Sequence, residues 1–187
     1  MDNDKKFKKD FESGFGALER INFMSDLLSK QNEIRNILDT RASIIIGLNS
    51  ALLIFLVGEY KNIAANSAYL ITALIMLSAV FISVICSILA LKPPASKTKK
   101  GQEESIFYHH HIDDKPLNGY MAEVHNALES ERKIYNEYIK ETYNLTVYSN
   151  IPRKYYISLA IKALIYGLLL AVGVFLLTII YIHLIEL

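Results

Sequence analysis

Two long uncharged apolar runs dominate the pattern of hydrophobic and polar positions along this chain. Residues 42–58 carry no charge between Arg41 and Glu59, and residues 68–91 carry none at all. At about 1.5 Å per residue, helices of these lengths cross most or all of a hydrocarbon layer that is about 30 Å thick. The connection between them is too short to hold a domain, so the two runs predict an antiparallel membrane hairpin.

A third apolar run begins at residue 155 and continues to residue 187, interrupted only by Lys162, His183 and Glu186. The lysine can extend its ammonium group to the cytosolic interface, which leaves residues 163–182 as the hydrocarbon segment. The predicted fold class is therefore all-α, a helical integral membrane protein with three transmembrane helices and a helical cytosolic region.

Helical periodicity extends into the polar parts of the chain. From residue 17 apolar side chains recur every three or four positions, and no proline or glycine intervenes before Gly47, so one helix should run from residue 17 into the first span. Residues 117–149 show a second apolar stripe opposite charged positions, and Pro152 predicts a break or kink. These two amphipathic helices, from two or more subunits, would bury their stripes in a four-helix-type bundle.

The patterning divides the chain into four parts. They are an N-terminal cytosolic tail and amphipathic helix (1–41), the transmembrane hairpin (42–91, with spans at 42–58 and 68–91), a cytosolic linker and long amphipathic helix (92–154), and the third transmembrane helix (155–187).

Basic residues fix the expected orientation. They lie beside the cytosolic ends of the spans at Arg35, Arg41, Lys92, Lys97, Lys99 and Lys100, whereas the hairpin tip has only Lys61. Because positive charge gathers on the cytoplasmic side, the N-terminus should lie in the cytosol and the C-terminus outside. The first residues also lack the apolar core and cleavage site of a secretory signal.

Composition excludes several classes of function. The net charge of +1 does not favour a nucleic-acid polymer as partner, and the single cysteine, Cys86, excludes a disulfide framework. No nucleotide-binding, metalloprotease or nucleophile motif is present, so we predict neither an enzyme nor a cofactor. His109, His110, His111, Asp113 and Asp114 are metal-ligand types, but adjacent histidines cannot all turn to one centre. This spacing favours an ordinary loop and leaves a metal site open.

Two short motifs stand where helices enter the membrane. The first, LDTRAS at residues 38–43, precedes Gly47 and Asn49; the second, YNL at 143–145, is followed by RKY at 153–155 and by Leu159 and Ala160. They resemble the D-x-[KR]-A and Y-x-L…K-Y-x-x-L-x-x-A motifs of the transmembrane effectors of Pycsar antiphage systems. The shared layout covers roughly residues 30–185. The stretch FYHHHIDDKP departs from the family's phenylalanine- and glycine-rich segment, which leaves the identity of the ligand open.

The resemblance implies a multi-pass effector in the bacterial inner membrane. Such an effector responds to a cyclic nucleotide made by a partner cyclase after infection, and it impairs the membrane so that the infected cell stops growing. A structural or regulatory subunit of a larger membrane complex is the alternative. A cyclase gene beside this one would favour the effector.

Two sets of residues are candidates for the response. A cyclic nucleotide needs a cation for its phosphate and an aromatic face for its base, and the second amphipathic helix supplies Arg132, Lys133, Tyr135, Tyr138, Lys140 and Tyr143. The alternative is a solvated helix face with ion pairs. For coupling to the spans the candidates are Asp39, Arg41, Arg153 and Lys154. Asp39 would be unfavourable beside anionic headgroups without a cation, so we predict its contact with Arg153 or Lys154. Arg41 could equally anchor lipid phosphates.

Within the spans, Asn49 and Ser50 are the most polar pair at mid-membrane depth, where an amide either bonds to a neighbouring helix or lines a pore. Each span also has small residues at helical spacing: Gly47 and Ala51; Ala79, Ser83 and Ser87; and Ala163, Gly167 and Ala171. Such rows let helices approach closely, either within one subunit or between subunits. Since three spans cannot enclose a conducting path alone, we expect a homo-oligomer.

Overall fold

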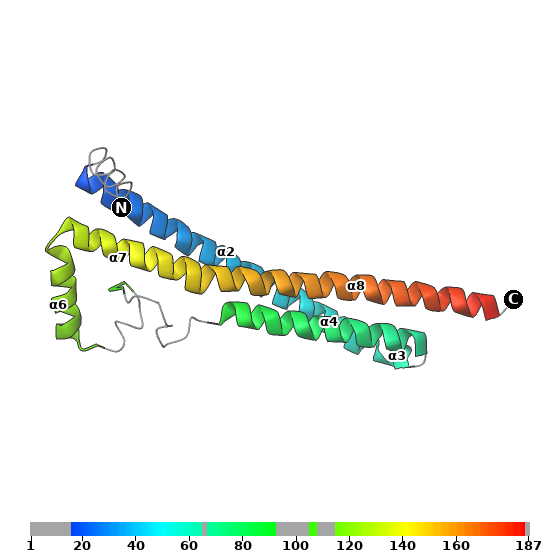
Figure 1. Cartoon of the computed structure of the whole chain (residues 1–187). Coiled ribbons are helices and arrows are strands. Elements are labelled where there is room, and N and C mark those ends of the chain that lie inside the picture. Colours follow the sequence, from blue (N-terminus) through cyan, green and yellow to red (C-terminus); the bar gives the residue numbers. More distant parts are fainter. Residues whose placement is uncertain (1–15, 65–66, 93–104, 108–114, 186–187) are drawn as a thin grey trace. The chain divides into compact units, whose positions relative to one another are not determined.

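The computed structural model describes residues 16–64, 67–92, 105–107 and 115–185. Within these ranges the chain forms helices and turns, and no strand (Figure 1). Three of the described helical stretches are long and apolar enough to cross a membrane. The all-α fold class with three membrane-spanning helices is therefore confirmed.

The first amphipathic segment and the first span form one helix, as predicted. Helix α2 (Ala17–Gly58) has 42 residues without interruption. At about 1.5 Å per residue it is about 60 Å long, twice the thickness of the hydrocarbon layer. The short helix α3 (Tyr60–Ala64) and helix α4 (Ser67–Leu91) complete the hairpin.

The prediction of a single helix over 117–149 was wrong. The structure has α6 (Leu117–Leu128) and α7 (Glu131–Asn144), and α6 turns sharply from the line of α7 (Figure 1). Ser130 lies between them in an extended conformation, and its hydroxyl accepts a hydrogen bond from the Lys133 amide. This is an N-cap, which satisfies a donor at the start of α7 and begins a new helix. Periodicity missed the break because both helices continue the same apolar spacing.

Pro152 does not break the chain's last helix. Instead a π-helical segment, η1 (Leu145–Asn150), follows α7 directly and leads into α8 (Ile151–Ile185). Proline lacks an amide donor, and its ring conflicts with the carbonyl four residues earlier. The wider π turn just before Pro152 alters the bonding pattern where that donor is missing, so helical structure continues.

Contacts divide the chain into two compact units. The amphipathic unit comprises residues 1–35 and 94–149 and contains the start of α2 with α6 and α7. The membrane unit comprises residues 36–93 and 150–187 and contains the rest of α2 with α3, α4 and α8.

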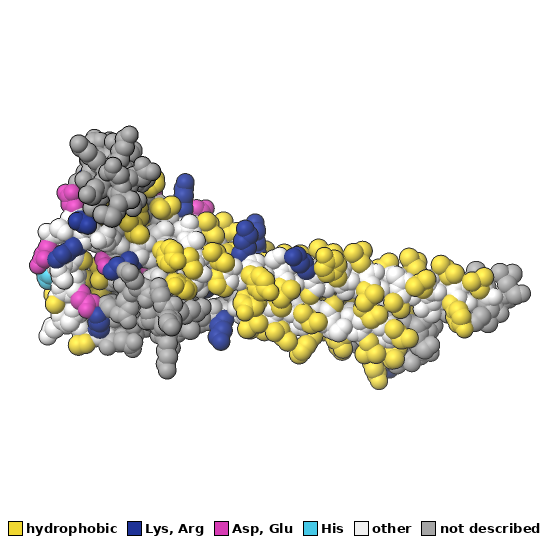
Figure 2. Space-filling view, viewed as in Figure 1, with side chains coloured by type: hydrophobic (Ala, Val, Ile, Leu, Met, Phe, Trp, Pro, Cys, Tyr) yellow, Lys and Arg dark blue, Asp and Glu magenta, His cyan; other side chains and the backbone are white. Residues whose placement is uncertain are grey.

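The core of the membrane unit is built from three helices. It consists of Leu38, Ala42 and Ile45 of α2, Cys86 and Ala90 of α4, and Ile157 and Ala160 of α8. Farther along, α4 and α8 lie side by side (Figure 1), and an ideal Cβ on Gly167 would be only 2.1 Å from the Ala79 Cβ. By contrast, many large side chains point outward, and hydrophobic groups cover the visible face of α4 and α8 (Figure 2). An outward apolar surface around a small-residue interior is what a lipid environment favours.

Labelling of introduced cysteines tests the proposed orientation. In a Cys86→Ala background, Lys61→Cys in α3 should react with a membrane-impermeant maleimide in intact spheroplasts. Leu117→Cys, at a side chain 71% exposed, should react only after lysis. Labelling of Leu117→Cys in intact spheroplasts would reverse the orientation inferred from the basic residues.

Candidate functional site

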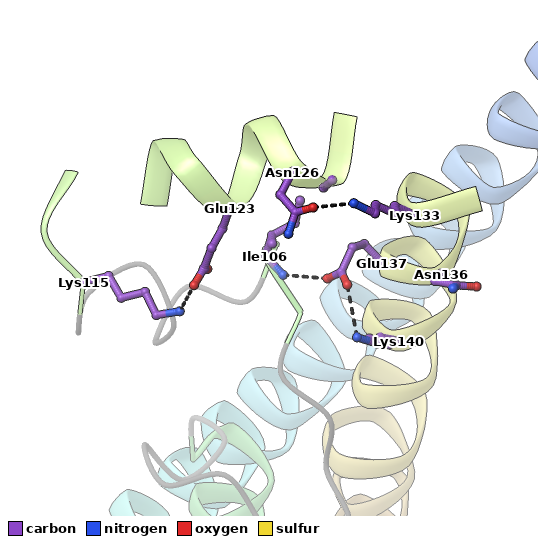
Figure 3. Close-up of a pocket in the computed structure, with 9 residues that line it drawn as sticks. Ile106, Lys115, Glu123, Asn126, Lys133, Asn136, Glu137 and Lys140 are labelled. Atoms are coloured by element: carbon purple, nitrogen blue, oxygen red, sulfur yellow. Dashed lines mark hydrogen bonds and ion pairs between the residues drawn. The ribbon is translucent and has the colours of Figure 1, made fainter. Parts of the chain in front are cut away.

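A cavity of about 500 Å³ lies within the amphipathic unit, between α6, α7 and the turn at 105–107. Its lining consists of Ile106, Lys115, Glu123, Asn126, Ala127, Lys133, Asn136, Glu137 and Lys140 (Figure 3). Ligand sites in proteins commonly have volumes of about 300–1,000 Å³. The break at Ser130 creates this cavity, because it turns α6 out of the line of α7 so that residues of both helices line one space.

The lining carries more positive than negative charge. It has three lysines and two glutamates, which leaves a net charge of +1. Lys133, Glu137 and Lys140 follow one another at spacings of four and three on α7, so they share one face of the helix. Lys115 comes from the opposite wall, just before α6 begins. The cavity therefore presents ammonium groups from two sides.

Each lysine is held by a neighbouring acceptor. Lys115 forms an ion pair with Glu123, and Lys140 donates to Glu137 Oε1 at 3.1 Å. Lys133 donates to the Asn126 side-chain oxygen and to Glu129 Oε2, the latter at 2.7 Å. That hydrogen bond and the charge of Lys133 lower the pKa of Glu129. Solvent weakens such exposed and partly exposed pairs, so an anionic ligand can compete with the present acceptors for these ammonium groups.

The turn at 105–107 is fastened to α7. The Ile106 amide donates to Glu137 Oε2 at 3.0 Å, and the Phe107 ring lies 4.9 Å from the Tyr138 ring between centroids. One turn beyond Glu137, burial raises the pKa of Glu141, while a hydrogen bond with Ser105 and the charge of Arg35 oppose that rise. These contacts hold the turn against α7, and its Ile106 lines the cavity.

The structure separates the six residues that the sequence offered as nucleotide contacts. Lys133 and Lys140 line the cavity, whereas Arg132 is exposed outside the lining. Tyr138 packs on Phe107, Tyr143 packs edge-on against Tyr148, and Tyr135 is half-buried outside the lining. The reasoning from sequence missed Lys115, Glu123, Asn126 and Asn136. The sequence feature that could have indicated the break before α7 is Ser130, a good N-cap residue followed by an acidic first turn.

A second group of candidates lies in the membrane unit. Arg153 Nε of α8 donates to Asp39 Oδ1 of α2 at 2.9 Å, with side chains 9% and 36% exposed respectively. The predicted contact between Asp39 and this basic pair is therefore present, and Arg153 makes it. Lys154 and Arg41 are exposed. The Asp39–Arg153 pair joins α2 to α8 beside the buried core of the unit.

The polar pair at mid-membrane depth is split. Asn49 is fully buried and donates from Nδ2 to Ser83 Oγ of α4 at 3.0 Å, while its Oδ1 has no hydrogen-bond partner among the described residues. Ser50 is exposed, and its hydroxyl donates back to the Ile46 carbonyl at 2.9 Å. Adjacent residues on a helix face different directions, so only Asn49 reaches the interior.

In the described part of the chain, no group of three or more metal-binding side chains comes together. The histidine and aspartate run at 109–114 lies outside the described residues.

Comparison with known proteins identifies the family. A model of the Pycsar effector protein domain, PycTM, matches residues 24–180. Neither the curated proteins nor the solved structures include a significant match to this chain. The matched segment contains the cavity, the Asp39–Arg153 contact and most of each membrane-spanning helix. This chain therefore belongs to the Pycsar effector family and is a transmembrane effector of antiphage defence.

Proposed function

We propose that a cyclic nucleotide activates this effector by binding in the cavity of the amphipathic unit, and that activation impairs the integrity of the inner membrane. The observation that carries the proposal is a cavity with excess positive charge within a Pycsar effector. Membership of this family implies a cyclic-nucleotide signal and a membrane context, and the family is not a known enzyme family.

The lining has the chemistry that this ligand needs. Lys133 and Lys140 supply ammonium groups for the cyclic phosphate, and charge-assisted hydrogen bonds to phosphate are among the strong ones. Asn126 and Asn136 supply amides, each with both donors and an acceptor, that suit the edge of a base. A partner cyclase would supply the ligand from the cytosol, and the distribution of basic residues favours a cytosolic position for this unit.

Helix continuity supports coupling to the membrane. Helix α7 leads through η1 into α8, and α2 runs from the amphipathic unit into its own span. A ligand shifts such a system only if it binds one arrangement of the helices more tightly than another. Ligand binding would supply this difference, because Lys133 and Lys140 would leave Glu129 and Glu137 only when the ligand is bound. A homo-oligomer would then carry the rearranged spans.

The proposal is tested by reversing charge inside and outside the cavity. Lys133→Glu with Lys140→Glu should weaken binding of the activating cyclic nucleotide to the full-length protein in detergent by about tenfold or more, because two charge-assisted contacts are lost. Arg132→Glu on the same helix is the matched control and should bind as wild type. Isothermal titration with the four common cyclic mononucleotides measures both. Equal affinity of the two variants would overturn the assignment of the site.

A further inference from the structure

The carboxylate of Glu137 joins two walls of the cavity in the amphipathic unit. Its Oε2 accepts a hydrogen bond from the Ile106 backbone amide at 3.0 Å, and its Oε1 accepts one from the Lys140 ammonium group at 3.1 Å (Figure 3). The Glu137 side chain is only 15% exposed. One buried carboxylate therefore occupies a backbone donor from the turn at 105–107 and a cation from α7 at the same time.

A backbone amide beside an ammonium group is also a good site for a phosphate. Both groups donate hydrogen bonds, and the ammonium group adds charge, which makes hydrogen bonds to an anion stronger. The phosphate of a cyclic nucleotide resembles a carboxylate in this respect, because two of its oxygens share one negative charge. The two donors that hold Glu137 therefore suit the phosphate equally well.

The turn at 105–107 has anchors other than the Glu137 carboxylate. Ser105 is fully buried, and its hydroxyl accepts a hydrogen bond from the Phe107 amide at 3.2 Å. The Phe107 ring packs on Tyr138 of α7. The Ile106 amide should therefore stay beside α7 if the Glu137 side chain moves. A glutamate side chain has several rotatable bonds, so its carboxylate can swing toward solvent while the helix stays in place.

We propose that Glu137 is an internal substitute for the phosphate of the ligand. On binding, the phosphate takes the Ile106 amide and the Lys140 ammonium group, and the Glu137 carboxylate rotates out of the cavity. The two anions do not share these donors, because like charges at such short distances repel each other. Glu137 thus lowers the affinity of the cavity for anions and sets the ligand concentration at which the site fills. This inference rests on the proposed function, which places a cyclic nucleotide in this cavity.

Neutralising Glu137 should tighten binding. Glu137→Gln keeps an acceptor for the Ile106 amide but loses the charge that competes for Lys140. It should bind the activating cyclic nucleotide about fivefold more tightly than wild type, which is the size of a partly exposed ion pair. Glu131→Gln is the matched control: it removes a carboxylate from an exposed position of α7 outside the cavity lining and should bind as wild type. Isothermal titration of the full-length proteins in detergent with the four common cyclic mononucleotides measures both.

Hydrogen–deuterium exchange of the amides at 105–107, followed by mass spectrometry, tests the second donor. In Glu137→Ala the Ile106 amide loses its acceptor, so it should exchange about tenfold faster than in wild type. Adding a cyclic nucleotide, or dimethyl phosphate as a phosphodiester without a base, should slow this exchange again. Wild-type exchange should change little on binding, because one acceptor replaces another. Glu131→Ala should exchange as wild type.

The two probes separate this inference from the proposed function. If a cyclic nucleotide binds Glu137→Gln and wild type equally, or leaves exchange fast in Glu137→Ala, Glu137 is not a substitute for the phosphate, although the nucleotide site remains. If no cyclic nucleotide binds but dimethyl phosphate slows exchange in Glu137→Ala, the anion site is supported and the proposed ligand is wrong. Wild-type exchange in Glu137→Ala without any ligand would also overturn the inference.

Discussion

Replacing Gly167 by leucine separates α4 from α8 and destabilises the membrane unit by about 2 kcal/mol or more. Even the Cβ of alanine at this position would lie 2.1 Å from the Ala79 Cβ, closer than real Cβ atoms approach. Neither atom can rotate away, so the helices themselves must move. For a chain of this size the thermal midpoint in mild detergent should fall by about 5 °C or more, measured by circular dichroism.

The same helix supplies the matched control. An added Cβ at Gly173 meets nothing within 4 Å, so Gly173→Leu should change the midpoint little. The facing residue supplies a rescue: Gly167→Ala should be destabilising alone and should recover when Ala79→Gly removes the opposing methyl group. If Gly167→Leu and Gly173→Leu unfold at the same temperature, the close crossing of α4 and α8 does not hold in the membrane.

Asp39→Asn should cause growth arrest in uninfected cells, while the protein still inserts in the membrane. The substitution removes the carboxylate that faces the Arg153 guanidinium, whose side chain is only 9% exposed. Breaking a buried pair costs about 3–5 kcal/mol. The greater exposure of Asp39 reduces that to about 1–3 kcal/mol, still enough to shift a balance between two arrangements of helices by about fivefold or more. The measurement is colony formation after induced expression, without a cyclase, alongside membrane fractionation.

The exposed basic neighbours are the controls for this contact. Lys154→Gln and Arg41→Gln each remove a positive charge at the same interface and should behave as wild type. The exchange of Asp39→Arg with Arg153→Asp should restore part of the lost stability, since it rebuilds the pair in reverse. If the Asp39→Asn strain grows as wild type with and without a cognate cyclase, the Asp39–Arg153 pair does not control growth arrest.

What the sequence predicts well here follows from strong, local physical constraints. The long apolar runs identify the membrane-spanning helices because lipid demands helices with internally satisfied backbones. The Asp39–Arg153 contact was predictable because a carboxylate at the lipid interface needs a cation, and few lie at the same depth. Neither inference required knowledge of side-chain packing.

The cavity was not predictable in the same way. Its walls depend on the break at Ser130, and a break between two helices with the same apolar spacing leaves no trace in the periodicity. Lys133 and Lys140 share α7 with the candidate tyrosines, as expected, but without the break nothing in the sequence places Lys115 and Asn126 at the same cavity. The close approach at Gly167 shows the intermediate case. The row of small residues was visible, but which helix it faced depended on the packing of α4 against α8.

The hydrogen bonding of the Asn49 side chain has a consequence for where water enters the membrane unit. Its amide gives a bond to Ser83, but its oxygen is buried without a partner among the described residues, a state that costs about 1–3 kcal/mol. That cost is recovered when a donor reaches the oxygen. A single water molecule that enters between α2 and α4 at this depth would therefore be stabilised in the otherwise apolar interior. Hydration of the helix bundle would then begin in the middle of the membrane.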